Sequence, residues 1–263
     1  MLVEAQGGED RAKYGDNLIK EYSKKLTDEL GKGYSIRSLK YMRKFYIFQK
    51  RQALPAQLTW SHYIELLKIE DFNIINYYID TTIKQSLSTR KLRNKIKNNE
   101  YERLDEETKN KIINKENNNQ IKDFIKHPIL IKNSIDYQEI SEKVLKQLIL
   151  EDIPSFMQEL GDGFSFINSE YKIKLGNRYN YIDLLLYNIE YNCYVVVELK
   201  ITELKKEYIG QIQTYMNYID KNIKKVHQDK TIGIIICKKD NQFIMEYCSD
   251  DRIYQTTYEL INL

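Results

Sequence analysis

The sequence predicts an α+β protein in which an all-helical N-terminal domain precedes an α/β domain with a central mixed sheet. In the first part of the chain, apolar residues recur at helical spacing, as Leu18, Tyr22, Leu26 and Leu30 do. In the second part, strand-like runs alternate with helical stretches in the order helix, three strands, helix, two strands. A polar segment rich in Asn and Lys, residues 105–120, separates the two patterns. These observations predict two domains of different class.

The composition is that of a globular protein. A chain of 263 residues is long enough for one or two domains with cores of their own. Hydrophobic residues make up 42% of it and Gly and Pro number only 10 and 3, which excludes collagen-like and wholly disordered chains. The three cysteines form no CxxC pair, so we expect neither a disulfide framework nor a structural zinc site. The sequence shows neither a long apolar run nor a secretory signal, and we therefore expect a cytoplasmic protein without a membrane partner.

The helical domain is expected over residues 14–104, after a disordered tail at residues 1–13. Its first helix should end at Gly31, because glycine is a common residue just after a helix. Ser35 and Ser88 each precede a basic helical stretch. A serine hydroxyl at that position can accept a hydrogen bond from an amide of the first turn, so both serines are predicted to be N-caps.

A further helix is predicted at residues 58–69, with Thr59 or Ser61 as its N-cap. Its apolar stripe comprises Trp60, Ile64 and Leu67. His62 falls within this helix, and a lone histidine without ligand partners is more often structural than chemical. The polar segment 105–120 is expected to be a linker or the frayed end of a helix, which leaves residues 121–263 for the α/β domain.

Two basic runs in the helical domain favour a surface for nucleic acid. Residues 32–51 contain seven basic side chains and residues 81–99 contain six, and neither run has an acidic one. Solvated helix faces are the alternative interpretation of such runs. Our candidate nucleic-acid contacts are Arg37, Lys40, Arg43, Lys44, Arg90, Lys91, Arg93 and Lys97.

The α/β domain is expected to begin with a helix at residues 139–160. The pattern then predicts strands at 164–175, 179–187 and 194–201, a helix at 203–219, and strands at 231–237 and 243–247. Short connections between the first three strands indicate hairpins.

The strand at residues 194–201 carries two charges, Glu198 and Lys200, within an apolar run. Charge in a buried strand is costly unless it is paired or bound to a metal ion. If residues 179–201 form a hairpin centred between residues 190 and 191, Asp183 lies directly opposite Glu198. Two opposed carboxylates repel each other, and a divalent cation such as Mg²⁺ between them turns that repulsion into a binding site.

An exposed ladder of ion pairs is the alternative explanation for Asp183, Glu198 and Lys200. The next predicted helix places Gln211 and Tyr215 four residues apart on one face, beside its apolar stripe. That arrangement supports a functional site at the strand, although such a pair alone is more often a surface pair.

The order Asp183, Glu198-x-Lys200, Gln211-x-x-x-Tyr215 resembles the (D/E)-(D/E)xK signature and QxxxY helix of RecB-type members of the PDDEXK superfamily. Longer stretches in the same order resemble the bacterial YhcG-like family, among them GYSIRSLKYMRKFY, LTWSHYIELLK, YIDLLLYN, VVVELK and GQIQTYMNYID. The resemblance implies a restriction-endonuclease-like (PDDEXK) core behind a nucleic-acid-binding helical domain. It also implies phosphodiester hydrolysis that depends on Mg²⁺ or Mn²⁺.

The resemblance also assigns roles to residues. Asp183 and Glu198 would hold the metal, Lys200 would act on the attacking water or the developing charge, and Gln211 and Tyr215 would steady the site and the phosphate. The sequence departs from the family at Lys146, where the family commonly has a glutamate. Glu142, one helical turn earlier, is our candidate for the missing ligand.

We therefore expect a nuclease that acts on DNA rather than RNA, in genome defence or mobile-element processing. Two alternatives remain at this stage. The first is a catalytically weak or inactive module with the same fold that binds nucleic acid, an interpretation that Lys146 favours. The second is a protein-interaction subunit, either as a homodimer or within a larger defence or mobile-element complex.

Overall fold

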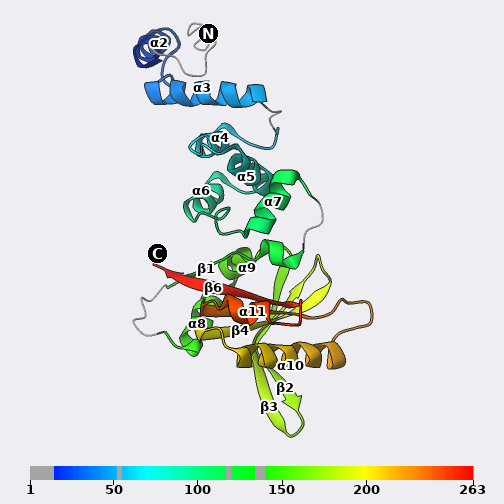
Figure 1. Cartoon of the computed structure of the whole chain (residues 1–263). Helices are drawn as coiled ribbons and strands as arrows, with labels where there is room; N and C mark the ends of the chain where they lie inside the picture. Colours follow the sequence, from blue (N-terminus) through cyan, green and yellow to red (C-terminus); the bar gives the residue numbers. More distant parts are fainter. Residues whose placement is uncertain (1–14, 52–54, 117–119, 134–139, 263) are drawn as a thin grey trace. The chain divides into compact units, whose positions relative to one another are not determined.

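A computed structural model describes residues 15–51, 55–116, 120–133 and 140–262 (Figure 1). The chain divides into two compact units, Met1–Tyr101 and Glu102–Leu263. The first is helical and the second contains one mixed sheet, as the sequence predicts, and this sheet has six strands. The tail expected at residues 1–13 lies outside the described residues. Among the described helices, none is long and apolar enough to cross a membrane.

The first unit consists of helices whose starts agree with the predicted caps. Ser38 N donates to Ser35 Oγ (3.2 Å) at the start of its helix, and Lys91 N donates to Ser88 Oγ (3.4 Å) at the start of another. Both predicted serine caps are therefore confirmed. The helices of this unit are α2 (Gly15–Leu30), α3 (Ile36–Arg51), α4 (Trp60–Leu66), α5 (Phe72–Lys84) and α6 (Thr89–Lys97).

Helix α4 differs from its predicted stripe but confirms the structural role of His62. Of the predicted stripe, Leu67 is buried and Ile64 is partly buried, but Trp60 is 39% exposed. His62 and Tyr63 are buried as well, so the buried face is shifted from the predicted one. His62 Nδ1 accepts a hydrogen bond from Thr59 N (3.1 Å), and His62 Nε2 lies 3.0 Å from the Leu87 carbonyl oxygen. The polar contacts of the imidazole explain why a histidine takes an interior position.

The segment that we expected as a linker contains a helix, α7 (Glu106–Asn114), which belongs to the second unit. Asp105 caps it by accepting from Thr108 N (2.7 Å). On the buried side, Lys111 Nζ lies 3.0 Å from Asp123 Oδ2, in the short 3₁₀ helix Ile121–Phe124. Polar contacts hold this helix in place. The spacing of apolar residues in the sequence therefore did not predict it.

The sheet has the strand order β1-β6-β5-β4-β3-β2 (Figure 1). The pairs β1–β6, β6–β5 and β5–β4 are parallel, and the pairs β4–β3 and β3–β2 are antiparallel hairpins. The strands are β1 (Ile129–Lys132), β2 (Phe164–Leu175), β3 (Arg178–Asn188), β4 (Cys193–Glu203), β5 (Ile232–Lys239) and β6 (Ile253–Ile261).

Helices cover both faces of the sheet and leave each face of β4 in a different core. Helices α8 (Glu142–Glu151) and α9 (Ile153–Leu160) pack with Val195 and Val197, whereas α10 (Lys206–Asn222) packs with Val196. Because side chains alternate along a strand, Glu198 and Lys200 point to the α10 face. The fold thus places both charges of β4 beside α10.

Three expectations for this domain were incomplete or wrong. The helix expected at residues 139–160 is divided at Asp152, which caps α9 with Pro154 in its first turn. The strand expected at 243–247 is the short helix α11 (Gln242–Glu246), because Asn241 accepts from Ile244 N and caps it. Strands β1 and β6 were not predicted.

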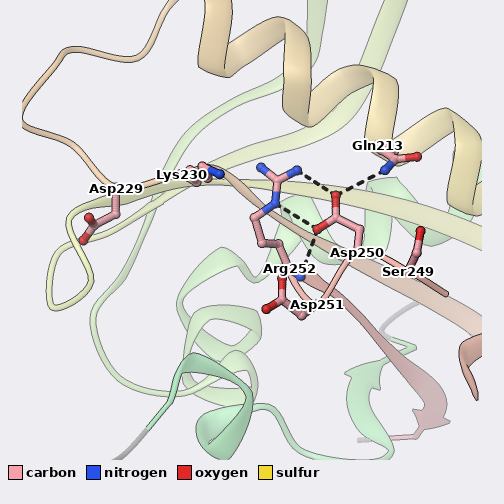
Figure 2. A pocket seen from close by; sticks show the side chains of 7 residues that line it. All are labelled: Gln213, Asp229, Lys230, Ser249, Asp250, Asp251 and Arg252. Carbon is pink, nitrogen blue, oxygen red and sulfur yellow. Dashed lines mark hydrogen bonds and ion pairs between the residues drawn. The ribbon is translucent and has the colours of Figure 1, made fainter.

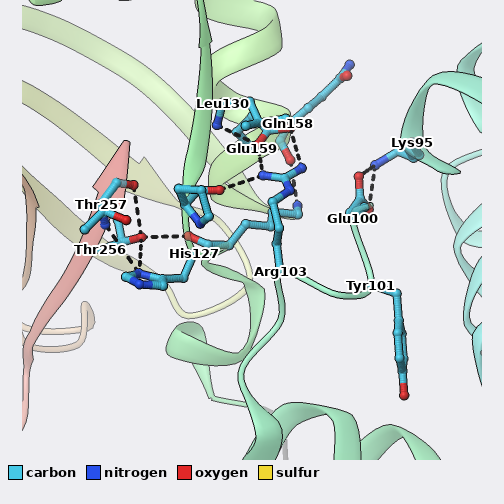
Figure 3. A network of polar contacts seen from close by, with 12 residues as sticks. Lys95, Glu100, Tyr101, Arg103, His127, Leu130, Gln158, Glu159, Thr256 and Thr257 are labelled. Carbon is cyan, nitrogen blue, oxygen red and sulfur yellow. Dashed lines mark hydrogen bonds and ion pairs between the residues drawn. The ribbon is translucent and has the colours of Figure 1, made fainter. Parts of the chain in front are cut away.

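A buried polar network joins residue 103 to the sheet domain (Figure 3). Arg103 Nη1 donates to Glu159 Oε2 and to the Pro128 carbonyl oxygen (2.7 Å), and Leu130 N donates to the same Glu159 oxygen (3.1 Å). Both charged side chains are largely buried, at 9% and 14% exposure. A single carboxylate therefore accepts hydrogen bonds from a guanidinium and from a backbone amide of β1.

We expect Glu159→Ala to lower the free energy of unfolding by about 3–5 kcal/mol, because it leaves the Arg103 guanidinium buried without its carboxylate. Urea unfolding followed by circular dichroism measures the effect. Glu246→Ala, which removes an exposed carboxylate of α11, is the control and should cost less than about 0.5 kcal/mol. Equal stability of the two variants would contradict this assignment.

Candidate active site

The β3–β4 hairpin has the register predicted from the sequence. Its paired residues run from Asn188↔Cys193 to Leu184↔Val197, so the hairpin is centred between residues 190 and 191. The regular ladder ends there, and the next positions along the two strands are Asp183 and Glu198. Asp183 Oδ2 accepts a hydrogen bond from Leu199 N (3.0 Å), which holds the aspartate against β4 at the end of the ladder.

Glu198 is almost completely buried, at 1% exposure. Burial first, and then the charge of Asp183, raise the pKa of Glu198 to about 7. One carboxylate oxygen, Oε2, accepts from Lys200 Nζ (3.2 Å) and Gln211 Nε2 (3.1 Å). The other, Oε1, is buried and has no hydrogen-bond partner within the described part of the chain. A buried carboxylate with one unsatisfied oxygen is well suited to bind a cation.

Gln211 connects the carboxylate to the helix α10. Its Nε2 donates both to Glu198 Oε2 and to the hydroxyl of Tyr215 (3.1 Å), which is 5% exposed. Lys200 is also buried and lies 5.2 Å from the ring centroid of Tyr208. The structure thus brings together all five side chains that we predicted to be catalytic: Asp183, Glu198, Lys200, Gln211 and Tyr215.

Two residues join this cluster that the predicted set did not include. Lys146 Nζ lies 3.1 Å from Asp183 Oδ1 and 3.0 Å from Glu170 Oε1. Glu170 has a left-handed backbone, with φ of 50°, in β2. The sequence marked Lys146 as a departure from the family, but gave no sign that its ammonium binds the proposed metal ligand Asp183. Glu170 had no sequence signal.

Glu142, the candidate for a further ligand, is half exposed and its Oε2 lies 4.0 Å from Lys200 Nζ. The structure therefore places it beside the ammonium group of Lys200. Across the described residues, no three His, Cys, Asp or Glu side chains are arranged to enclose a metal ion. Mg²⁺ needs no such cage, because it commonly keeps several waters and uses only one or two protein carboxylates.

The charges of the cluster also fit a divalent cation. Four carboxylates (Glu142, Glu170, Asp183 and Glu198) face two ammonium groups (Lys146 and Lys200), which leaves a formal charge of −2. Together with the unsatisfied oxygen of Glu198, this excess makes the donor set compatible with Mg²⁺ or Mn²⁺.

The candidate nucleic-acid contacts lie on two helices of the first unit. Six of them have exposed or partly exposed side chains: Arg37, Lys40, Arg43, Arg90, Lys91 and Lys97. Lys44 Nζ donates to the Leu67 carbonyl oxygen (3.1 Å), and Arg93 forms an ion pair with the buried Glu65 (2.8 Å). Arg93 is nonetheless 58% exposed. Lys44 and Arg93 thus hold the unit together as well.

A separate polar cavity lies in the second unit, lined in part by Gln213, Lys230 and Arg252 (Figure 2). The guanidinium of Arg252 is held by Asp250 (2.6 Å) and by Asp220 (3.0 Å). None of the residues predicted for catalysis lines this cavity. Its central arginine is neutralised by its own neighbours.

The chain matches known protein families in both of its parts. Residues 119–261 match the family model of the YhcG PDDEXK nuclease domain, and residues 1–103 match the DUF1016 N-terminal domain. The chain is 26% identical over 270 residues to the putative nuclease YhcG of Escherichia coli strain K12, a match that covers 88% of this chain and 72% of that protein.

The chain also matches parts of solved structures, among them a repair endonuclease from Pyrococcus abyssi and an EndoMS–dsDNA2 complex. Their sequence identities to this chain are 19% and 18%, and their TM-scores are 0.33 and 0.32. Each match spans about half of both chains: 47% of this chain and 49% of the first structure, and 49% of each chain for the second. The family model covers more than half of the sequence. The chain belongs to the family that carries the YhcG PDDEXK nuclease domain.

Proposed function

We propose that this nuclease hydrolyses phosphodiester bonds in DNA with the help of Mg²⁺ or Mn²⁺. The observation that carries the proposal is the buried Glu198 oxygen without a hydrogen-bond partner, next to Asp183 and within the reach of Lys200. Such a pair of carboxylates is able to hold one hard cation. A bound cation supplies an activated water and neutralises charge on the phosphate.

The chain's own residues then have separable tasks. Asp183 and Glu198 would hold the cation, and Gln211 fixes the carboxylate of Glu198 from α10. Lys200 places an ammonium 3.2 Å from Glu198, where it can stabilise negative charge that develops on the phosphate. Tyr215 fixes Gln211 in turn. Glu142 is the proposed outer member of the set, on the side of Lys200.

An assay for cleavage tests the proposal. The full chain should cleave DNA in Mg²⁺ or Mn²⁺ and stop when EDTA removes the metal. Single- and double-stranded DNA and RNA of one sequence should be compared, because the proposal names DNA as the substrate. Cleavage that is equally fast in EDTA, or confined to RNA, would contradict it.

The location and a second candidate function follow from particular observations. Cys193, Cys237 and Cys248 are all free thiols, which suits a reducing compartment, and we propose the cytoplasm.

The ion pair of Lys146 with Asp183 favours a second candidate, a weakly active or inactive module with this fold within a homodimer or a larger assembly. In that case Lys146 satisfies Asp183 permanently, and added metal changes neither cleavage nor stability.

We further propose that α3 and α6 of the first unit bind the phosphates of DNA. We expect the affinity of the full chain for duplex DNA to fall with salt, and its salt slope to become shallower by about 0.9 for each phosphate contact removed. The variants to test are Arg37→Ala, Lys40→Ala, Arg90→Ala and Lys97→Ala, whose side chains are exposed. Lys20→Ala, on α2, is the control. If none of the four variants changes the salt slope, the proposed role of α3 and α6 is to bind a protein rather than DNA.

A further inference from the structure

The hairpin of β2 and β3 carries an exposed face of lysine and tyrosine that leads away from the active site. Lys172 pairs with Tyr181, and Lys174 pairs with Tyr179, directly across the two strands. All four side chains are exposed, and the two tyrosines remain 56% (Tyr179) and 53% (Tyr181) accessible. We call these four residues the hairpin ladder. In Figure 1 the hairpin extends past α10, beyond the rest of the sheet.

The opposite face of the same hairpin explains why the ladder is free. Ile173 and Ile182 are buried in the core beneath α10, and Tyr171 and Leu175 pack against that core. Side chains alternate between the two faces of a strand, so the burial of this set directs the ladder outward. The hairpin is therefore held in place by one face and presents the other.

The ladder has the charge and geometry of a binding surface. Residues 171–182 contain three basic side chains (Lys172, Lys174 and Arg178) and no acidic one. Lys172 Nζ lies 3.8 Å from the ring centroid of Tyr179, a cation–π contact that places a positive charge beside the aromatic ring. Solubility alone would explain lysines on the edge strand β2, but not two large aromatic rings that are more than half exposed.

The ladder is also continuous with the catalytic cluster. Tyr181 precedes Asp183 by two residues on β3, about 7 Å along the strand. On β2, Lys172 follows Glu170 by two residues, and Lys146 bridges Glu170 to Asp183. A polymer bound along the ladder would therefore run toward Asp183, one of the two proposed metal ligands.

We propose that the hairpin ladder binds an unpaired DNA strand beside the phosphate that is cut, with tyrosines stacking on bases and lysines contacting phosphates. Exposed aromatic rings next to cations are the usual means of holding single strands, because each base offers a face for stacking. In a duplex these faces are already stacked on one another. This inference rests on the proposed function, since it names the form of DNA that the site takes.

The test is binding of a fluorescent single strand of about 16 nucleotides to the full chain in EDTA, where metal-dependent cleavage cannot occur. We expect Tyr179→Ala with Tyr181→Ala to weaken binding at least about tenfold, because each lost stacking contact costs about 5–150-fold. Tyr179→Phe with Tyr181→Phe should stay within about twofold of the wild type, because phenylalanine keeps the ring. Lys172→Ala with Lys174→Ala should make the salt slope shallower by about 1.4.

The control is Tyr247→Ala with Lys221→Ala, which removes an exposed tyrosine and lysine elsewhere in the same unit. The inference would be overturned if the tyrosine-to-alanine variant bound the single strand as tightly as the wild type does. It would also be overturned if the variant lost as much affinity for a blunt duplex as for the single strand. A preference of the ladder for single-stranded RNA would overturn it as well. Binding in EDTA is measured apart from cleavage. If the chain cuts DNA but the ladder variants bind as the wild type does, only this inference is refuted. A chain that binds through the ladder but never cuts refutes only the proposed function.

Discussion

Replacing Glu198 by glutamine, or Asp183 by asparagine, should reduce Mg²⁺-dependent cleavage of DNA to less than about one thousandth of the wild-type rate. A metal ion supplies several kcal/mol of transition-state stabilisation, and each 1.36 kcal/mol corresponds to about tenfold in rate. Both substitutions keep the size of the side chain and remove the charge that would hold the ion. The measurement is the initial rate on a labelled DNA at saturating Mg²⁺.

Stability distinguishes loss of the metal site from loss of the fold. The folded-state pKa of Glu198 is raised to about 7, so its burial destabilises the protein increasingly from about pH 4.5 upward and fully above pH 7. At pH 8 in EDTA, Glu198→Gln should therefore melt at or above the wild-type temperature. Glu203→Gln, near the end of the same strand, is the matched control and should keep its activity. If the Asp183 variant cleaves DNA at nearly the wild-type rate, Asp183, Glu198 and Lys200 form a set of structural ion pairs rather than a metal site.

Lys200→Ala should lower the cleavage rate about 10²–10³-fold while changing the affinity for DNA little. One preorganised charge beside the reacting group typically contributes that much to the rate. Lys200→Arg should not restore activity, because Lys200 is buried against Glu198 and Tyr208, and a planar guanidinium does not fit the place of a compact ammonium.

The readout is the turnover number under saturating DNA, compared with the dissociation constant measured without metal. Lys205→Ala, an exposed lysine just after β4, is the control. If turnover and affinity fall by the same factor, Lys200 is a simple phosphate contact rather than a residue that acts in the transition state.

The parts of the site that were predictable are those fixed by local patterns. The hairpin register follows from two strand patterns and a short turn, and the structure confirms it from Asn188↔Cys193 to Leu184↔Val197. The contact of Gln211 with Glu198 follows from the helix that packs next to that strand. The family resemblance added the roles of these residues, which no spacing could supply.

The parts that were missed depend on contacts between distant segments. Strand β1 has only four residues and is stabilised by parallel pairing with β6, which lies more than a hundred residues later in the chain. The ion pair of Lys146 with Asp183 depends on how α8 packs over the sheet. At residues 243–247, a strand was expected, but the N-cap that Asn241 provides favours a helix instead.

The central claim is that Asp183 and Glu198 together bind one divalent cation, and Mn²⁺ binding measures this directly. Titration calorimetry of the full chain, purified in EDTA and dialysed, should show one Mn²⁺ site, and Mg²⁺ should compete for it. The same titration of Glu198→Gln and of Asp183→Asn should show that this site is lost, whereas Glu203→Gln should keep it. A wild-type chain that binds no Mn²⁺, or variants that bind it as tightly as the wild type, would contradict the account.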